Sequence, residues 1–224
     1  MRVFRRANLI LASNTYILSC KNRVGVYVVD PGDSLPILNW LHSHKKRLLG
    51  IFLTHAHFDH MYGLNDLLTV FPYSYLYVSL KMVDGLFSVK LNTSLYHENP
   101  YTLKKCHSKN IRILNEKNWP LLWGYTDLFI LKTPGHTNDS ISLKIDNYLF
   151  TGDALIPGIK VYHRNKMGNF ADVTSSLANI YNTFEDNTIL LPGHGKDFLL
   201  VESKSTEGFC ALEPGNKFTE IKRD

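Results

Sequence analysis

The segment THAHFDH, which ends at His60, places three histidines and one aspartate directly after the apolar run at residues 48–53. If that run is a buried strand, His55 and His57 lie two positions apart and can point to the same side. Asp59 and His60 then fall in the first turn of a helical pattern and can face the same space. Imidazole and carboxylate groups suit a borderline cation such as Zn²⁺. The segment therefore predicts a metal site, and a histidine-rich surface loop is the alternative.

Three later segments repeat this arrangement of a short apolar run, small or turn-forming residues and one side chain that can bind a metal. Those side chains are His136 in TPGHT, Asp153 in TGD and His194 in PGHG. Open α/β sheets bind ligands at the carboxyl ends of their strands, so four strands that end in this way predict one shared site. The glycines allow the backbone to pass close to that site, because they carry no Cβ.

The order HxHxDH, TPGHT, GD and PGHG resembles the metallo-β-lactamase superfamily of binuclear metallohydrolases, over a region from about Asn14 to Gly195. The resemblance implies an αββα sandwich, in which two β-sheets pack face to face and helices cover their outer sides. Apolar periodicity by itself indicates only a mixed α/β (α+β) fold. We expect a single domain over residues 1–224, without the C-terminal helical domain of glyoxalase II.

The same resemblance implies two divalent metal ions and assigns their ligands. One metal would be bound by His55, His57 and His136, the second by Asp59, His60 and His194, and Asp153 would bridge the two. Zinc is the default metal, and iron and manganese accept the same ligands.

Two departures within the superfamily exclude some activities. The β-lactamases of this fold lack a bridging aspartate at the position of Asp153, and the flavodiiron oxidoreductases carry a glutamate where this chain has His57. Antibiotic hydrolysis and flavodiiron chemistry are therefore not expected.

The expected chemistry is hydrolysis by a metal-bound hydroxide. Bound zinc lowers the pKa of water from its far higher bulk value to about 7, and a centre with net positive charge stabilises a developing oxyanion. Asp59 can accept the released proton and is the catalytic residue that we predict. Asp30, which ends a strand before a tight turn, is a candidate for orienting a metal ligand, although a plain turn residue would look the same.

Residues 154–170 follow Asp153 and are expected to border the substrate. Lys160, Tyr162 and Arg164 are candidates for binding an anionic acyl substrate, and an ordinary solvated basic loop is the alternative. The leading interpretation is a small acyl thioester or ester, as in a single-domain glyoxalase II-like (hydroxyacylglutathione hydrolase-like) enzyme. The glycine- and arginine-containing pattern of the glyoxalase II loop is not reproduced. An RNA or DNA phosphodiesterase, an iron-dependent sulfur dioxygenase and a non-catalytic metal-binding module are the other hypotheses.

Net charge and cysteine spacing indicate which binding partner and which cellular compartment to expect. The net charge is +5, but the basic residues occur in small scattered groups, so a nucleic acid is not the expected partner. Cys20, Cys106 and Cys210 show no paired spacing, which favours a reducing cytoplasm. The apolar segment near the N-terminus is interrupted by polar residues 13–15, which argues against an export signal, and no apolar run is long enough to cross a membrane. The oligomeric state stays open.

Secondary structure follows from apolar spacing and turn residues. We expect a hairpin and a helix capped by Ser34 in the N-terminal part, a second helix between His60 and Phe71, and only weak signals over residues 79–110. The predicted strands are 15–20, 24–29, 48–53, 75–78, 111–114, 127–133, 140–145, 148–151 and 188–191. The helix capped by Ser34 covers 34–44, and the other predicted helices are 81–87 and 175–184.

Overall fold

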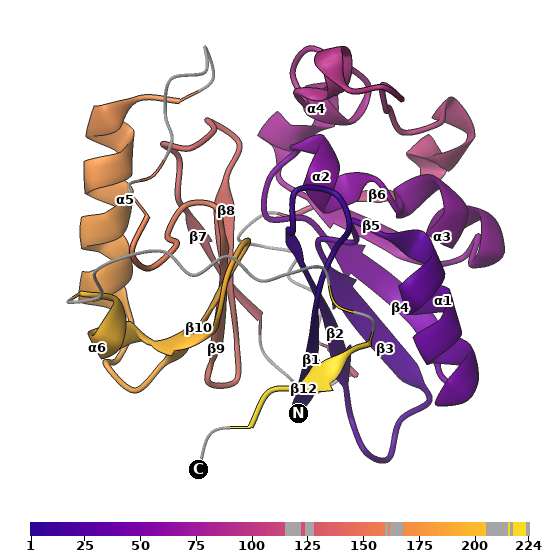
Figure 1. Cartoon of the computed structure of the whole chain (residues 1–224), viewed down its shortest axis with the longest axis horizontal. Coiled ribbons are helices and arrows are strands. Elements are labelled where there is room, and N and C mark those ends of the chain that lie inside the picture. Colours follow the sequence, from indigo (N-terminus) through magenta and orange to yellow (C-terminus); the bar gives the residue numbers. More distant parts are fainter. Residues whose placement is uncertain are drawn as a thin grey trace.

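Two β-sheets form the centre of the computed structural model, which describes residues 1–114, 122–123, 128–159, 161, 168–204, 215 and 217–222 (Figure 1). The strand orders are β12-β1-β2-β3-β4-β5-β6 and β11-β10-β9-β8-β7. The seven strands of the first sheet are β1 (Arg2–Ala7), β2 (Asn14–Ser19), β3 (Gly25–Val29), β4 (Arg47–Phe52), β5 (Tyr75–Val78), β6 (Ile111–Ile113) and β12 (Thr219–Glu220). The five of the second are β7 (Leu128–Lys132), β8 (Ile141–Ile145), β9 (Tyr148–Gly152), β10 (Ile189–Pro192) and β11 (Phe198–Leu199).

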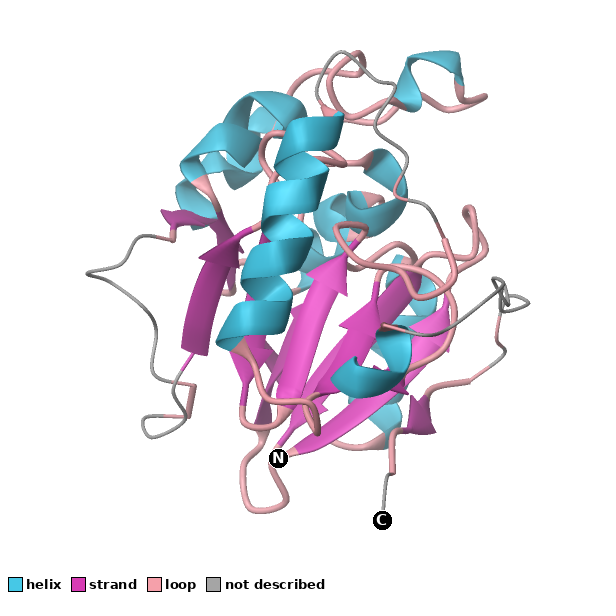
Figure 2. Ribbon diagram, turned by 90° about the vertical axis from the view of Figure 1, so that its left-hand side faces the viewer, coloured by secondary structure: helices cyan, strands magenta, loops and turns pink. Residues whose placement is uncertain are grey.

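Helices cover the outer side of each sheet, so the predicted αββα sandwich is confirmed (Figures 1 and 2). Helices α1 (Ser34–Ser43) and α3 (Leu64–Val70) lie outside the first sheet, and α5 (Phe170–Thr183) and α6 (Leu200–Ser203) outside the second. The shorter helices are α2 (Phe58–Met61), α4 (Val83–Leu86) and the 3-10 turns η1 (Leu80–Met82), η2 (Ser94–Tyr96) and η3 (Lys105–Asn110).

Strands β2 and β10 are buried on both faces. All six residues of β2 are buried, which is why this strand shows no alternation of apolar and polar residues. Between the sheets, Phe150 of β9 packs edge-on against Tyr16 of β2, with ring centroids 5.3 Å apart. On the outer side, Ile180 of α5 is fully buried and packs with Leu149 and Leu190 of the second sheet.

Strand direction brings four loops to one edge of the sandwich. Strands β3, β4 and β5 are parallel to one another, and β9 is parallel to β10. Strand β7 runs in the same direction as β9, because both are antiparallel to β8. The segments that follow β4, β7, β9 and β10 therefore leave the strands where the two sheets meet around α2 (Figure 1).

Three sequence expectations need correction. Asp33, not Ser34, occupies the N-cap of α1, and Ser34 instead donates to Asp66 Oδ2 at 2.6 Å. Strand β1, absent from the predicted strands, pairs along all six residues with β2 and buries Val3 and Phe4 between its arginines. Helix α5 begins at Phe170 rather than at residue 175, since the Asn169 side chain accepts the backbone N–H of Asp172 and caps it there.

No helix in the described part of the chain combines the length and the apolar character needed to cross a membrane. The longest of them, α5, has 14 residues.

Candidate metal centre

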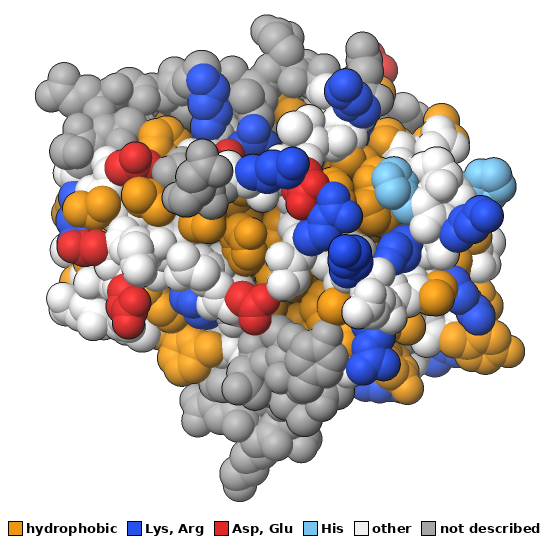
Figure 3. All heavy atoms as spheres, turned by 90° about the horizontal axis from the view of Figure 1, so that it is seen from below, with side chains coloured by type: hydrophobic (Ala, Val, Ile, Leu, Met, Phe, Trp, Pro, Cys, Tyr) orange, Lys and Arg blue, Asp and Glu red, His pale blue; other side chains and the backbone are white. Residues whose placement is uncertain are grey.

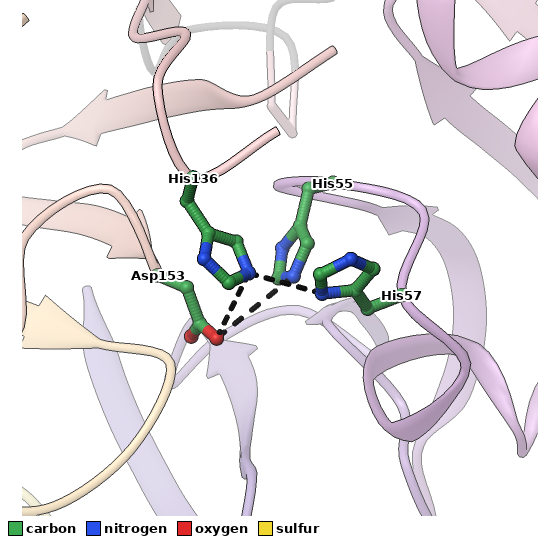
Figure 4. Close-up of side chains that lie close together, drawn as sticks. All are labelled: His55, His57, His136 and Asp153. Atoms are coloured by element: carbon green, nitrogen blue, oxygen red, sulfur yellow. Dashed lines mark hydrogen bonds and ion pairs between the residues drawn. The ribbon is translucent and has the colours of Figure 1, made fainter. Parts of the chain in front are cut away.

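Seven side chains from the four predicted segments meet at this edge in two groups. The first contains His55, His57, His136 and Asp153, and these side chains point toward one another (Figure 4). The second contains Asp59, His60 and His194. Within each group the potential ligand atoms lie within 4.8 Å of one another. The structure therefore brings together every residue that the resemblance assigned to the metals.

The Asp153 carboxylate contacts members of both groups. Its Oδ2 atom lies 4.0 Å from His55 Nε2 and 3.5 Å from His136 Nε2, in the first group. The same oxygen is 3.5 Å from His194 Nε2, and Oδ1 is 3.6 Å from His60 Nε2, in the second. One carboxylate thus stands between the two sets of imidazoles, which is the position that a bridging ligand needs.

Glycine makes this close approach of two loops feasible. Gly193 precedes His194, and a Cβ on it would lie 2.1 Å from Asp153 Oδ1 and 2.8 Å from His60 Cε1. Gly152 precedes Asp153 and has a φ of 50°, in the left-handed region that glycine adopts at little cost. Any larger residue at position 193 would push a ligand away.

The donor set fits a metal on physical grounds. The Nε2 atoms of His55, His57 and His60 and the Oδ1 atom of Asp153 are buried without a hydrogen-bond partner among the described residues. An unsatisfied buried polar atom costs about 1–3 kcal/mol. His57 Nδ1 also lies 3.0 Å from His136 Nε2. At this separation only one of the two nitrogens can carry a proton that points toward the other. Coordination to a cation would satisfy these atoms together.

Burial and mutual charge polarise the cluster. Burial lowers the pKa of His57 to about 4 and, with the neighbouring imidazoles, holds the pKa of His55 well below its usual value. Burial also lowers the pKa of His60 and His194, but the nearby carboxylates outweigh it and raise these values to about 9 and about 10. For Asp153, burial raises the pKa, yet His60 and His194 hold it well below its usual range.

Asp30, the candidate orienting residue, contacts the centre from the end of β3. Its Oδ2 atom lies 3.2 Å from His60 Nδ1 and accepts the Thr54 hydroxyl at 2.6 Å. The Thr54 oxygen in turn lies 3.1 Å from His55 Nδ1. With Nδ1 of both histidines engaged in this way, Nε2 is the nitrogen that faces the metal groups.

Asp139 supports the first group and was not singled out in the sequence. Its Oδ2 atom accepts the backbone N–H of Ala56, between His55 and His57, at 3.2 Å. The residue is buried three positions after His136, so it ties the two histidine-bearing loops together. No pattern in one sequence marks such a contact, because it joins segments 83 residues apart.

The substrate candidates Lys160, Tyr162 and Arg164 lie outside the described residues. Their proposed contacts with a substrate stay predictions. Asp59, the predicted catalytic residue, is buried in the second group, 3.5 Å from His194 Nε2 and 3.4 Å from His60 Nε2. Burial raises its pKa, but these imidazoles outweigh that effect and lower it, so Asp59 is a carboxylate at neutral pH.

Comparison with known sequences gives a consistent picture. The sequence model described as metallo-beta-lactamase superfamily matches residues 10–194. A probable metallo-hydrolase of Streptococcus pyogenes serotype M6 is 28% identical over 214 residues, which cover 93% of this chain and 90% of that protein. A hydroxyacylglutathione hydrolase of Salmonella typhi is 31% identical over 167 residues, 75% of this chain and 56% of that protein. The chain thus spans little more than half the length of that hydrolase.

Solved structures show the same fold. The B3 metallo-β-lactamase BLEG-1 superposes with a TM-score of 0.81 at 24% identity, over 92% of this chain and 97% of that one. The protein TTHA1623, solved in a di-iron-bound form, gives a TM-score of 0.76 at 22% identity, over 90% and 98% of the two chains. At such low identity the likeness concerns architecture alone.

Proposed function

Because the chain belongs to the metallo-β-lactamase superfamily, we propose that it is a binuclear metal-dependent hydrolase of a small acyl thioester or ester. The observation that carries the proposal is the position of Asp153, whose carboxylate reaches histidines of both metal-binding groups. A single-metal site would not require one carboxylate between two complete sets of ligands.

The proposed roles follow the two groups. His55, His57 and His136 would hold one metal, Asp59, His60 and His194 the other, and Asp153 both. Two divalent ions, when bound, supply activation of water and a positive charge for the developing oxyanion. Asp59 is ionised at neutral pH and borders the reacting centre, so it is the group that can accept the proton released by the attacking water. Zinc suits the donors, and the di-iron neighbour keeps iron as the alternative.

The substrate class is inferred from relatives and from charge. The relative from Salmonella typhi is named a hydroxyacylglutathione hydrolase, which favours thioester hydrolysis. Lys and Arg side chains gather across the middle of the molecular end opposite α2 (Figure 3), whereas Asp59 and His60 lie on α2. These basic side chains lie away from the metal centre, and the basic residues of the sequence occur only in small groups rather than in a stripe that would track a phosphate backbone, so nucleic-acid cleavage has less support.

Metal analysis of Asp153→Ala tests the proposal. The wild-type protein, saturated with zinc and desalted, should retain about two ions per chain, since two ligand groups need two metals. The variant should lose one or both ions together with most of its hydrolysis of small acyl thioesters. Asp84→Ala, in an exposed position of α4, is the control and should change neither property.

Other outcomes distinguish the remaining hypotheses. A plateau at one metal ion in the wild-type protein would contradict the binuclear centre and favour the sulfur dioxygenase hypothesis. Chelator-sensitive cleavage of single-stranded RNA without turnover of any thioester would favour the phosphodiesterase.

A further inference from the structure

We propose that Ser13, Asn14 and Tyr16, which we call the β2 clamp, position the second metal-binding group and not the first. These residues stand at the amino end of β2 and are buried, with exposed fractions of 0%, 0% and 1%. None of them belongs to either ligand group. The inference rests on the proposed two-metal centre.

Asn14 and Tyr16 fix the loop that carries His194. The backbone N–H of Asn14 donates to Gly193 O at 2.6 Å, and its side-chain amide donates to the carbonyls of Pro192 and Gly195, each at 2.9 Å. The Tyr16 hydroxyl donates to Pro192 O at 2.6 Å. Backbone carbonyls on both sides of His194 are therefore held by two side chains of one strand.

Ser13 extends the clamp to the other part of the second group. Its hydroxyl donates to the backbone carbonyl of Asp59 at 2.7 Å, and its backbone forms an antiparallel bridge with His194. Residues 13 and 14 thus join the segment carrying Asp59 to the segment carrying His194, which are more than 130 residues apart in the sequence.

The first group has different supports. Asp139 accepts the N–H of Ala56 between His55 and His57, and Thr54 contacts His55 Nδ1. Asp30 and Thr54 contact histidines of both groups, whereas the clamp contacts only the segments carrying Asp59 and His194. Loss of the clamp should therefore weaken the second metal site more than the first. Outer partners of metal ligands typically change affinity about 10- to 100-fold when mutated.

The test is Zn²⁺ titration of Asn14→Ala and the wild-type protein against a fluorescent chelator. We expect the wild type to bind two ions. The variant should bind the first ion with unchanged affinity and the second about 10- to 100-fold more weakly. Tyr16→Phe, which removes one hydroxyl and keeps the buried ring, should weaken the second ion by a smaller factor and carries the test if Asn14→Ala does not fold.

Asn110 provides a matched control within the same chain. It is also buried, its side-chain amide donates to two carbonyls, Pro72 O at 2.9 Å and Ser74 O at 2.8 Å, and its Oδ1 atom, like that of Asn14, lacks a partner among the described residues. Asn110→Ala therefore loses comparable hydrogen bonds away from the ligands and should bind both ions as the wild type does.

Three results would overturn the inference: equal weakening of both ions in Asn14→Ala, no weakening in either clamp variant, or the same weakening in Asn110→Ala. Binding of a single ion by the wild-type protein would instead contradict the binuclear centre itself, so the two failures can be told apart.

Discussion

Asp30 shows how a residue that touches no metal can decide which atoms face one. It has a φ of 51°, is buried at the end of β3, and accepts hydrogen bonds from the backbone N–H and the hydroxyl of Thr54. Its second oxygen also lies against His60 Nδ1. A left-handed conformation at a non-glycine residue persists only where surrounding contacts stabilise it, and here those contacts serve two histidines.

Replacing this carboxylate by an amide should weaken metal binding. In Asp30→Asn one oxygen becomes an NH₂ group, so the side chain can no longer accept the Thr54 backbone N–H at one oxygen and the Thr54 hydroxyl and His60 Nδ1–H at the other. We expect metal affinity to fall about 10- to 100-fold while the circular dichroism spectrum is kept, as measured by chelator competition. Unchanged affinity would show that Asp30 acts as a turn residue only.

The charges of the cluster predict that metal binding releases protons. At pH 7 in the metal-free protein His60 and His194 are protonated, because their pKa values are about 9 and about 10. A metal binds only the neutral imidazole, so occupation of the second group should release about two protons at neutral pH. Calorimetry in buffers of different ionisation enthalpy measures this number, and affinity should rise with pH up to about 9–10. Binding without proton release would contradict the assignment.

The same pKa values determine how the stability of the metal-free protein depends on pH. Both histidines have a folded-state pKa above the ordinary value of 6.5, so their stabilisation is complete below pH 6.5 and is lost as pH rises through about 9 and 10. The melting temperature of the metal-free protein should therefore decrease between pH 7 and pH 10, and a rise over this range would contradict the charge pattern.

Among the elements, the loop after β10 is the most sensitive to size. Gly193→Ala would place a methyl group 2.1 Å from Asp153 Oδ1, so the loop or the carboxylate must move. We expect loss of at least one bound metal ion by elemental analysis. Gly215→Ala is the matched control, because its Cβ would meet no atom closer than 3.7 Å and should leave both ions in place.

The elements that the sequence predicted well are those whose signal is local. The hairpin of β2 and β3 and the strands before His55, Asp153 and His194 follow from apolar runs bounded by turn residues. Strand β1 pairs along its length with the adjacent β2, but three arginines interrupt its apolar pattern, and two of them are paired with residues far along the chain, Arg2 with Glu220 and Arg5 with Asp197. The charges of these arginines are thus paired with residues that a local pattern does not contain.

The residues of the site also separate into those with a local sequence signal and those without one. Its seven ligand candidates were predicted, since each stands beside a strand end with its own motif. The supporting residues Asn14 and Asp139 were not, because their contacts are visible only when distant loops are placed side by side. The substrate residues and the single-domain organisation stay predictions.

For the whole molecule, metal removal should reduce stability. A ligand that binds only the folded state at about 1,000 times its dissociation constant adds about 4 kcal/mol, which in a chain of this size corresponds to a melting-temperature shift on the order of 10 °C. Scanning calorimetry before and after chelation and zinc restoration measures the shift. A melting temperature indifferent to both treatments would mean that no metal is held in the folded state.

The division of the ligands between the sheets has one further consequence. His55, His57, Asp59 and His60 follow β4 of the first sheet, while His136, Asp153 and His194 follow strands of the second. Apart from β12, which returns to pair with β1, the two sheets are consecutive halves of the chain. If the polypeptide were divided between β6 and β7, neither fragment would contain a complete ligand set. Zinc would then act as a cross-link that holds the two fragments together.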